Sequence, residues 1–276
     1  MKQLTKVILL AVILAFVQGA TAQELKVISF NIRYNSWDNI DGENGWPNRK
    51  AAVAKMINEE RPAAIGLQEA LIDQLLYLDS MLVGYKRVGV GRDDGIIKGE
   101  FMAIYYDTTR IKMLAVSTKW LSETPRKPSL GWDAACRRTV TVAYMEELQS
   151  GKRFCYMNTH LDHVGKMARD EGARMIAEMA PEGQPVIIGG DMNSTIDDPI
   201  FKHFYDYGFK AAREMTSNTS HKDTYTGFGK DKPSLIDHFF VRGLKVESFI
   251  TLDGDYGVPY ISDHYPIEMV IEFNNY

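Results

Sequence analysis

Short apolar stretches rich in β-branched residues alternate with amphipathic stretches along most of the chain. Side chains alternate across a strand, or are apolar throughout when both faces are buried, so the first kind of stretch predicts strands. These strands are expected at residues 25–32, 64–68, 101–106, 111–116, 139–146, 152–158, 185–190, 235–241, 245–252 and 267–273. The second kind repeats apolar residues every three or four positions and predicts helices at residues 49–60, 71–82, 167–179 and 200–207.

This order of elements predicts an α/β (α+β) fold in which two mixed β-sheets pack together and helices cover them. Residues 139–146 and 152–158 are expected to form a hairpin that turns near Ser150 and Gly151. The chain has no internal repeat and no linker rich in Gly, Ser or Pro. Residues 23–276 are therefore expected to form one domain.

The first 22 residues have a different pattern. Lys2 and Lys6 precede an unbroken apolar run of 11 residues at 7–17, and small residues follow at Ala20 and Ala22. A basic start, a short apolar centre and an A-x-A end are typical of a secretory signal peptide. We therefore expect residues 1–22 to be cleaved near Ala22 and the mature chain to be periplasmic or extracellular. No later apolar run approaches the roughly 20 residues of a membrane span, so no transmembrane segment is expected there.

Composition narrows the class of protein further. With 45% apolar residues, 25% charged residues and two cysteines, the chain is neither disordered nor a disulfide scaffold. Cys136 and Cys155 could pair after export, although two buried free thiols are the favoured interpretation. Loss of Lys2 and Lys6 with the leader changes the net charge from −4 to −6. This charge and the lack of a basic stripe disfavour nucleic acid as a partner without excluding it.

Polar residues collect where the predicted strands end. Five short groups show this pattern: Ser29-Phe30-Asn31, Leu67-Gln68-Glu69, Asn158-Thr159-His160-Leu161, Gly190-Asp191-Met192-Asn193, and Ile236-Asp237-His238 together with Ser262-Asp263-His264. Strand ends on one rim of a sheet are close in space, and rigid strands hold side chains firmly. We therefore expect one pocket to contain Asn31, Glu69, His160, Asp191, Asn193, Asp237, Asp263 and His264.

The chemistry of these residues is consistent with a single reaction. Carboxylate and amide oxygens without cysteine suit a hard cation such as Mg²⁺ or Mn²⁺, and two histidines suit proton transfer. The set fits metal-assisted hydrolysis of a phosphate ester. Several arginines could hold phosphate oxygens or form ordinary surface ion pairs: Arg33, Arg92, Arg137 and Arg138.

Taken in order, these motifs resemble the endonuclease/exonuclease/phosphatase superfamily, the deoxyribonuclease I-like fold, over residues 25–273. The resemblance implies a four-layered sandwich with the site above two packed sheets. It implies that Asn31, Glu69 and Asp263 form the metal site, with Glu69 as the main ligand. His160 resembles the histidine that contacts the scissile phosphate or acts as an acid. Asp191 and Asn193 resemble the pair that holds or activates the attacking water.

The same resemblance implies that Asp237 orients His264 for in-line attack of water on phosphorus. It leaves open whether His264 or Asp191 is the general base, and whether one metal or two are bound. The Asn-Thr-His-Leu segment is similar to that of secreted sphingomyelinases and inositol-phosphate phosphatases. The full inositol-phosphatase signature is missing, because His238 follows Asp237. Residues 91–95, 120–125 and 131–135 resemble segments of small secreted bacterial hydrolases of this superfamily.

The leading interpretation is therefore an exported, monomeric, Mg²⁺-dependent phosphoesterase for a sugar, lipid-headgroup or nucleotide phosphate. A DNA or RNA nuclease is the alternative within the same superfamily. A non-catalytic binding protein would show decay of the site, and none of the eight positions is decayed. A glycoside hydrolase would need two carboxylates but would explain neither His160 nor His264.

Overall fold

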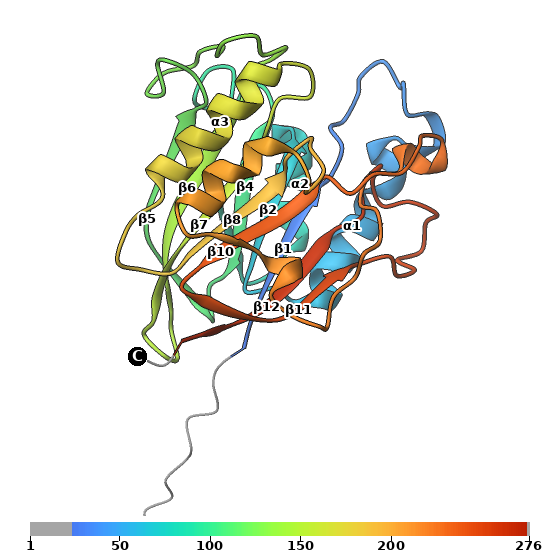
Figure 1. Cartoon of the computed structure of the whole chain (residues 1–276). Helices are drawn as coiled ribbons and strands as arrows, with labels where there is room; N and C mark the ends of the chain where they lie inside the picture. The colour runs from blue at the N-terminus through green and yellow to red at the C-terminus, as the bar shows by residue number, and fades with distance from the viewer. Residues whose placement is uncertain (1–23, 275–276) are drawn as a thin grey trace, which may run out of the picture.

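Two six-stranded β-sheets pack face to face, and helices cover the outer face of each sheet (Figure 1). The computed structural model describes residues 24–274, so the predicted leader at 1–22 lies outside the described residues. The first sheet has the order β11 (Leu244–Thr251), β12 (Ile267–Phe273), β1 (Leu25–Asn31), β2 (Ala64–Ala70), β4 (Phe101–Asp107) and β3 (Tyr85–Val88). The second has the order β5 (Ile111–Trp120), β6 (Thr139–Glu147), β7 (Arg153–His160), β8 (Val186–Asp191), β10 (Asp237–Arg242) and β9 (Lys210–Ala211).

The helices form the two outer layers, which confirms the predicted four-layered sandwich. The first sheet is covered by α1 (Trp46–Glu60) and α2 (Ile72–Met81), and the second by α3 (Lys166–Met179) and α4 (Lys202–Asp206). Single 3₁₀ turns lie at Gly42–Asn44, Pro199–Phe201, Ala212–Glu214 and Gly227–Gly229. No helix among residues 24–274 is long and apolar enough to cross a membrane.

Burial on both faces explains why the central strands carry apolar residues on both faces. In β1, Leu25 and Val27 belong to the core between the two sheets. Ile28 and Phe30 point to the opposite face and pack in the cluster that includes Val53 of α1. Because side chains alternate along a strand, a strand between two apolar layers must be apolar at nearly every position.

Most predicted elements are confirmed, and the differences occur at edges and ends. The hairpin of β6 and β7 forms as predicted. The first helix begins at Trp46 rather than Arg49, with Pro47 in its first turn, where a missing N–H has no cost. The short edge strands β3 and β9 were not predicted, because a four-residue or two-residue strand with an exposed face has too little periodicity to identify.

A buried polar contact joins the two sheets beneath their upper edge. Asn158 of β7 donates from Nδ2 to the carbonyl oxygens of Leu67 and Ala103, both at 2.9 Å. Its Oδ1 accepts a hydrogen bond from Gln68 Nε2 at 2.7 Å. A side chain at Gly66 would overlap with Asn158, so glycine is required there for close approach of the sheets. These bonds fix the position of β2 relative to β7.

Candidate active site

The sheet topology brings the predicted polar groups to one edge of the sandwich. β1 and β2 are parallel, as are β7 and β8, so the carboxyl ends within each pair are adjacent. In the second sheet His160 pairs with Asp191, and Asp191 pairs with Asp237. The loop between β11 and β12 carries Asp263 and reaches this edge through a bridge between Tyr225 and His264.

The strand ends surround a cavity of about 620 Å³. Eight of the predicted site residues line it: Arg33, Glu69, Arg92, His160, Asp191, Asn193, Asp263 and His264. Asn31 and Asp237 lie directly behind this wall, hydrogen-bonded to residues that line it. Arg137 is not among the lining residues. Its guanidinium is half-exposed and forms an ion pair with Asp93 at 3.3 Å, so its surface interpretation fits the structure better than phosphate binding.

A break in the regular strand directs Glu69 into the pocket. The pairing of β2 with β4 shifts between Leu67 and Ala70, and Glu69 has a left-handed backbone with φ of 61°. Glu69 Oε1 accepts a hydrogen bond from Asn31 Nδ2 at 3.0 Å, and Oε2 accepts one from the Tyr34 N–H at 3.2 Å. Bulges and strained backbone at a non-glycine residue are typical of functional positions.

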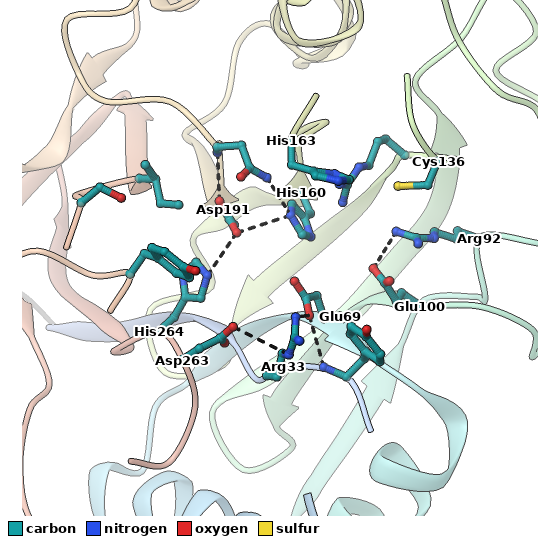
Figure 2. A pocket seen from close by; sticks show the side chains of 16 residues that line it. Arg33, Glu69, Arg92, Glu100, Cys136, His160, His163, Asp191, Asp263 and His264 are labelled. Carbon is teal, nitrogen blue, oxygen red and sulfur yellow. Dashed lines mark hydrogen bonds and ion pairs between the residues drawn. The ribbon is translucent and has the colours of Figure 1, made fainter. Parts of the chain in front are cut away.

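The floor of the pocket has an excess of negative charge. The guanidinium of Arg33 lies 3.9 Å from Glu69 and 3.8 Å from Asp263, but both hydrogen bonds of this side chain go to Asp41. Burial and the negative charge of Glu69 raise the pKa of Asp263. In Figure 2 the carboxylates of Asp263 and Glu69 point toward the same space on either side of Arg33. An all-oxygen donor set with uncompensated charge fits a hard divalent cation.

Asn31 acts here as a bridge between carboxylates. Its Nδ2 donates to Glu69 and, at 3.0 Å, to Asp191 Oδ2. Its Oδ1 accepts the Arg33 N–H at 3.0 Å. Asn31 therefore orients two acidic side chains, and its expected role as a direct ligand stays a prediction.

His264 forms a pair with a buried carboxylate. Its Nδ1 lies 2.8 Å from Asp237 Oδ2, and its Nε2 lies 3.6 Å from Asp191 Oδ2. Burial lowers the pKa of His264, but the carboxylates of Asp237 and Asp191 outweigh it and raise that pKa to about 10. Because the carboxylate of Asp237 can only accept, Nδ1 carries a proton. With its raised pKa the ring also carries a proton on Nε2 at neutral pH, and Nε2 is the nitrogen that faces Asp191. Burial also raises the pKa of Asp191 to about 7, although the charge of His264 opposes this.

The second histidine, His160, has a lowered pKa, in contrast to His264. Burial and the positive charge of Arg138 hold the pKa of His160 well below its ordinary value, so the ring is neutral at neutral pH. Asn193 Nδ2 donates to His160 Nε2 at 2.9 Å and to the Leu161 carbonyl at 3.0 Å. The proton of His160 therefore resides on Nδ1. Asn193 is held in place through its own N–H, which donates to Asp191 Oδ1 at 2.9 Å.

Several pocket residues carried no signal in the sequence motifs. Glu100, His163, Tyr34, Tyr225 and Cys136 all line the cavity. Most lie in loops without periodicity, and only His163 could have been found, since it follows the Asn-Thr-His-Leu strand end within three residues. Burial raises the pKa of Glu100 to about 7.

Both cysteines carry free thiols, as the favoured interpretation predicted, but only Cys155 is buried, whereas Cys136 is half-buried at the pocket. Cys136 Sγ lies 3.7 Å from Asp162 Oδ2, and Cys155 is buried in β7. Cys136, Asp162 and His163 are close enough together to hold a metal, but Arg138 already bonds to both Asp162 and His163. A guanidinium in this position repels a cation, so we assign no metal to this cluster.

The pocket thus combines buried carboxylates, a carboxylate-held histidine and a neutral histidine on the rim of a four-layered sandwich, which defines a phosphoester hydrolase of the deoxyribonuclease I-like fold. The sequence profile of the endonuclease/exonuclease/phosphatase family matches residues 28–264. The chain belongs to this family, whose members hydrolyse phosphoester bonds and generally depend on a divalent metal.

Related structures share the whole fold. A family protein from Bacteroides thetaiotaomicron is 30% identical, covers 91% of this chain and 96% of its own, and superposes with a TM-score of 0.86. A mannosyl-6-phosphatase from the same organism is 30% identical, covers 90% of this chain and all of its own, and has a TM-score of 0.83. A protein of unknown function from Acanthamoeba polyphaga mimivirus is 23% identical in an alignment 270 positions long, which covers 90% of this chain and 100% of the viral protein.

Proposed function

We propose that this protein is an exported hydrolase that uses Mg²⁺ or Mn²⁺ to cleave a small phosphate ester by in-line attack of water. The observation that carries the proposal is the convergence of Glu69, Asp191 and Asp263 on one cavity beside the Asp237–His264 pair. Glu69 and Asp263 are the proposed metal ligands, with Asn31 beside them. The bound cation would offset the charge of the phosphate and of the carboxylates.

The other residues of the pocket have proposed roles in proton transfer and in binding the phosphate. Asp191 Oδ2 accepts the proton of the attacking water, or His264 Nε2 does so once it has released its own proton; the two atoms are 3.6 Å apart and share one side of the cavity. Asp237 keeps His264 in the tautomer that leaves Nε2 available. His160 and Asn193 are the proposed contacts to phosphate oxygens, together with Arg33.

A phosphomonoester or a small phosphodiester is preferred over duplex nucleic acid as substrate. The cavity has the size of small-molecule sites, which span about 300–1,000 Å³. The similarity to a mannosyl-6-phosphatase also favours a small phosphate ester as the substrate. A nuclease would instead need a basic surface to neutralise the phosphates beside the site.

The test combines metal removal with one substitution. The purified protein is assayed with phenyl phosphate, bis-p-nitrophenyl phosphate and plasmid DNA, in EDTA and after addition of Mg²⁺ or Mn²⁺. Glu69→Gln should reduce kcat/KM for the small esters by about 1,000-fold, because it removes charge where the cation binds. The matched control is Glu146→Gln, whose carboxylate forms an ion pair with Arg153 outside the pocket and should leave activity unchanged.

Two results would contradict the proposal. Hydrolysis that continues at the same rate in EDTA would remove the metal from the mechanism. Efficient cleavage of plasmid DNA with no turnover of the small esters would identify a nuclease instead.

A further inference from the structure

The pocket extends beyond the catalytic residues to an end with different chemistry. We call this the distal end, and define it by Arg92, Glu100, Arg138 and His163. Figure 2 shows Arg92 and Glu100 on the side of the pocket opposite His264, with Glu69 between them. The proposed function assigns no role to Glu100 or His163.

Buried donors at the distal end have no partner among the described residues. Arg138 is 6% exposed, and its Nη1 is buried without a hydrogen bond. Its other nitrogens are engaged, since Nε donates to Asp162 at 3.2 Å and Nη2 to His163 Nδ1 at 2.9 Å. The Nε of Arg92 is also buried without a partner. Buried donors without partners are unfavourable, and both belong to arginines that line the cavity, so a bound ligand is a source of acceptors for these side chains.

The charges at the distal end cancel. Arg92 is paired with Glu100 at 2.6 Å, and Arg138 with Asp162 at 3.2 Å. Asp162 is ionised, because three backbone N–H groups outweigh its burial and hold its pKa well below the ordinary range. A second phosphate or a carboxylate would therefore meet the carboxyl groups of Glu100 and Asp162 as well as two cations.

The distal end offers both donors and acceptors. A guanidinium can only donate, so His163 Nδ1 accepts from Arg138 and neutral His163 carries its proton on Nε2. Glu100 provides an acceptor beside the donors of Arg92. A hydroxyl group is the ligand group that accepts from a guanidinium and donates to a carboxylate at the same time.

The tyrosine residues of the pocket lie outside the distal end. Tyr225 packs against His264 with ring centroids 5.1 Å apart, and Tyr34 lies beside Arg33. The distal end contains no tyrosine, phenylalanine or tryptophan, and its one ring is that of His163.

We propose that the distal end binds the hydroxyl groups of a polyol, such as a sugar or cyclitol, that carries the scissile phosphate. Arg92 and Glu100 contact one hydroxyl, and Arg138 and His163 contact its neighbours. These residues then determine substrate specificity without taking part in the chemical step. This inference rests on the proposed function, because it assumes that the phosphate is held by the catalytic residues.

The test compares substrates with and without hydroxyl groups. Wild-type protein, Glu100→Gln and Arg92→Met are assayed with mannose 6-phosphate, glucose 1-phosphate, myo-inositol 1-phosphate and phenyl phosphate, in the metal that supports activity. At least one polyol phosphate should exceed phenyl phosphate in kcat/KM. Each variant should lower kcat/KM for that polyol phosphate by roughly 10- to 100-fold, the effect of losing a hydrogen bond to a charged group. Phenyl phosphate hydrolysis should change less than about threefold. Arg153→Met, which breaks an exposed ion pair with Glu146, is the matched control.

The outcomes separate the two proposals. Turnover of phenyl phosphate with no preference for any polyol phosphate would overturn the specificity proposal and leave the proposed function standing. Equal losses on all substrates in well-folded variants would overturn it as well, because the distal end would then act on the phosphate itself. Inactivity toward every ester would overturn both.

Discussion

Arg49 connects the loops that carry the active site, although it contacts no predicted catalytic side chain. It is 1% exposed and lies in the first turns of α1. Its guanidinium donates to four carbonyl oxygens: those of Asn44 at 2.7 Å, Arg33 at 2.7 Å, Ile261 at 3.1 Å, and Ile32. Ile32 follows β1, and Ile261 lies two residues before Asp263. Burial lowers the pKa of Arg49 to about 10, so it is still charged at neutral pH.

The structure allows an estimate of what Arg49→Met would cost. The Arg33 carbonyl keeps a second donor in Gln74 Nε2 at 2.9 Å. The carbonyls of Ile32 and Ile261 would lose the Arg49 donor, at about 1–3 kcal/mol each. Release of a buried charge offsets part of this loss. We expect a net decrease of about 3 kcal/mol in the free energy of unfolding, and a Tm lower by about 6–12 °C for a chain of this size.

Urea unfolding followed by circular dichroism, with the same variants in a thermal melt, measures this change. Arg49→Lys is the matched variant: it keeps the charge but lacks the planar fork, so it should lose about 1–2 kcal/mol. A loss below about 1 kcal/mol for Arg49→Met would show that the four hydrogen bonds contribute little and would refute the reasoning.

Three further changes test other parts of the structure. Asp237→Asn should reduce kcat by about 100- to 10,000-fold with KM nearly unchanged, because His264 loses the carboxylate that holds the proton on its Nδ1. Unaltered kcat and KM in a steady-state assay would exclude this role. Burial raises the pKa of Glu100 to about 7, so between about pH 4.5 and 7 the folded state keeps a proton that the unfolded state releases. The stability that this group contributes at low pH is therefore lost as the pH rises from about 4.5 to 7. In EDTA, Glu100→Gln should therefore show a smaller decline in unfolding free energy over that range than the wild type, and parallel curves would contradict the assignment. Gly190→Ala should lower the free energy of unfolding by more than about 4 kcal/mol, because Gly190 has φ of 151° and a Cβ would overlap with the Thr159 carbonyl oxygen. A Tm within about 3 °C of wild type corresponds to a loss of only roughly 1 kcal/mol and would show that the strands can separate there.

Much of the fold was predictable because the strands that decide it are buried on both faces. Residues 185–190 carry no polar side chain and residues 25–32 are polar only at Lys26, Ser29 and Asn31. This pattern predicts buried strands whatever the partner strand is. The edge strand β3 was not predictable, since Tyr85-Lys86-Arg87-Val88 forms a strand only by pairing with β4. The sequence also cannot say which strands are neighbours, and strand order decides which ends meet.

The sequence by itself determined which residue types end the central strands, and with them the class of reaction. Glu69, His160 and Asp191 stand at the ends of apolar runs that form buried strands, whereas His264 lies in the loop before β12. Only the tertiary structure decided the roles of side chains whose partners are far away in the chain. It separated Arg137, on the surface, from its neighbour Arg138, in the pocket, because the orientation of one residue in a loop has no periodic signal. It placed Glu100 opposite His264, which are 164 positions apart. Proximity between such residues depends on the packing of two sheets, and no local pattern of hydrophobic and polar residues encodes it.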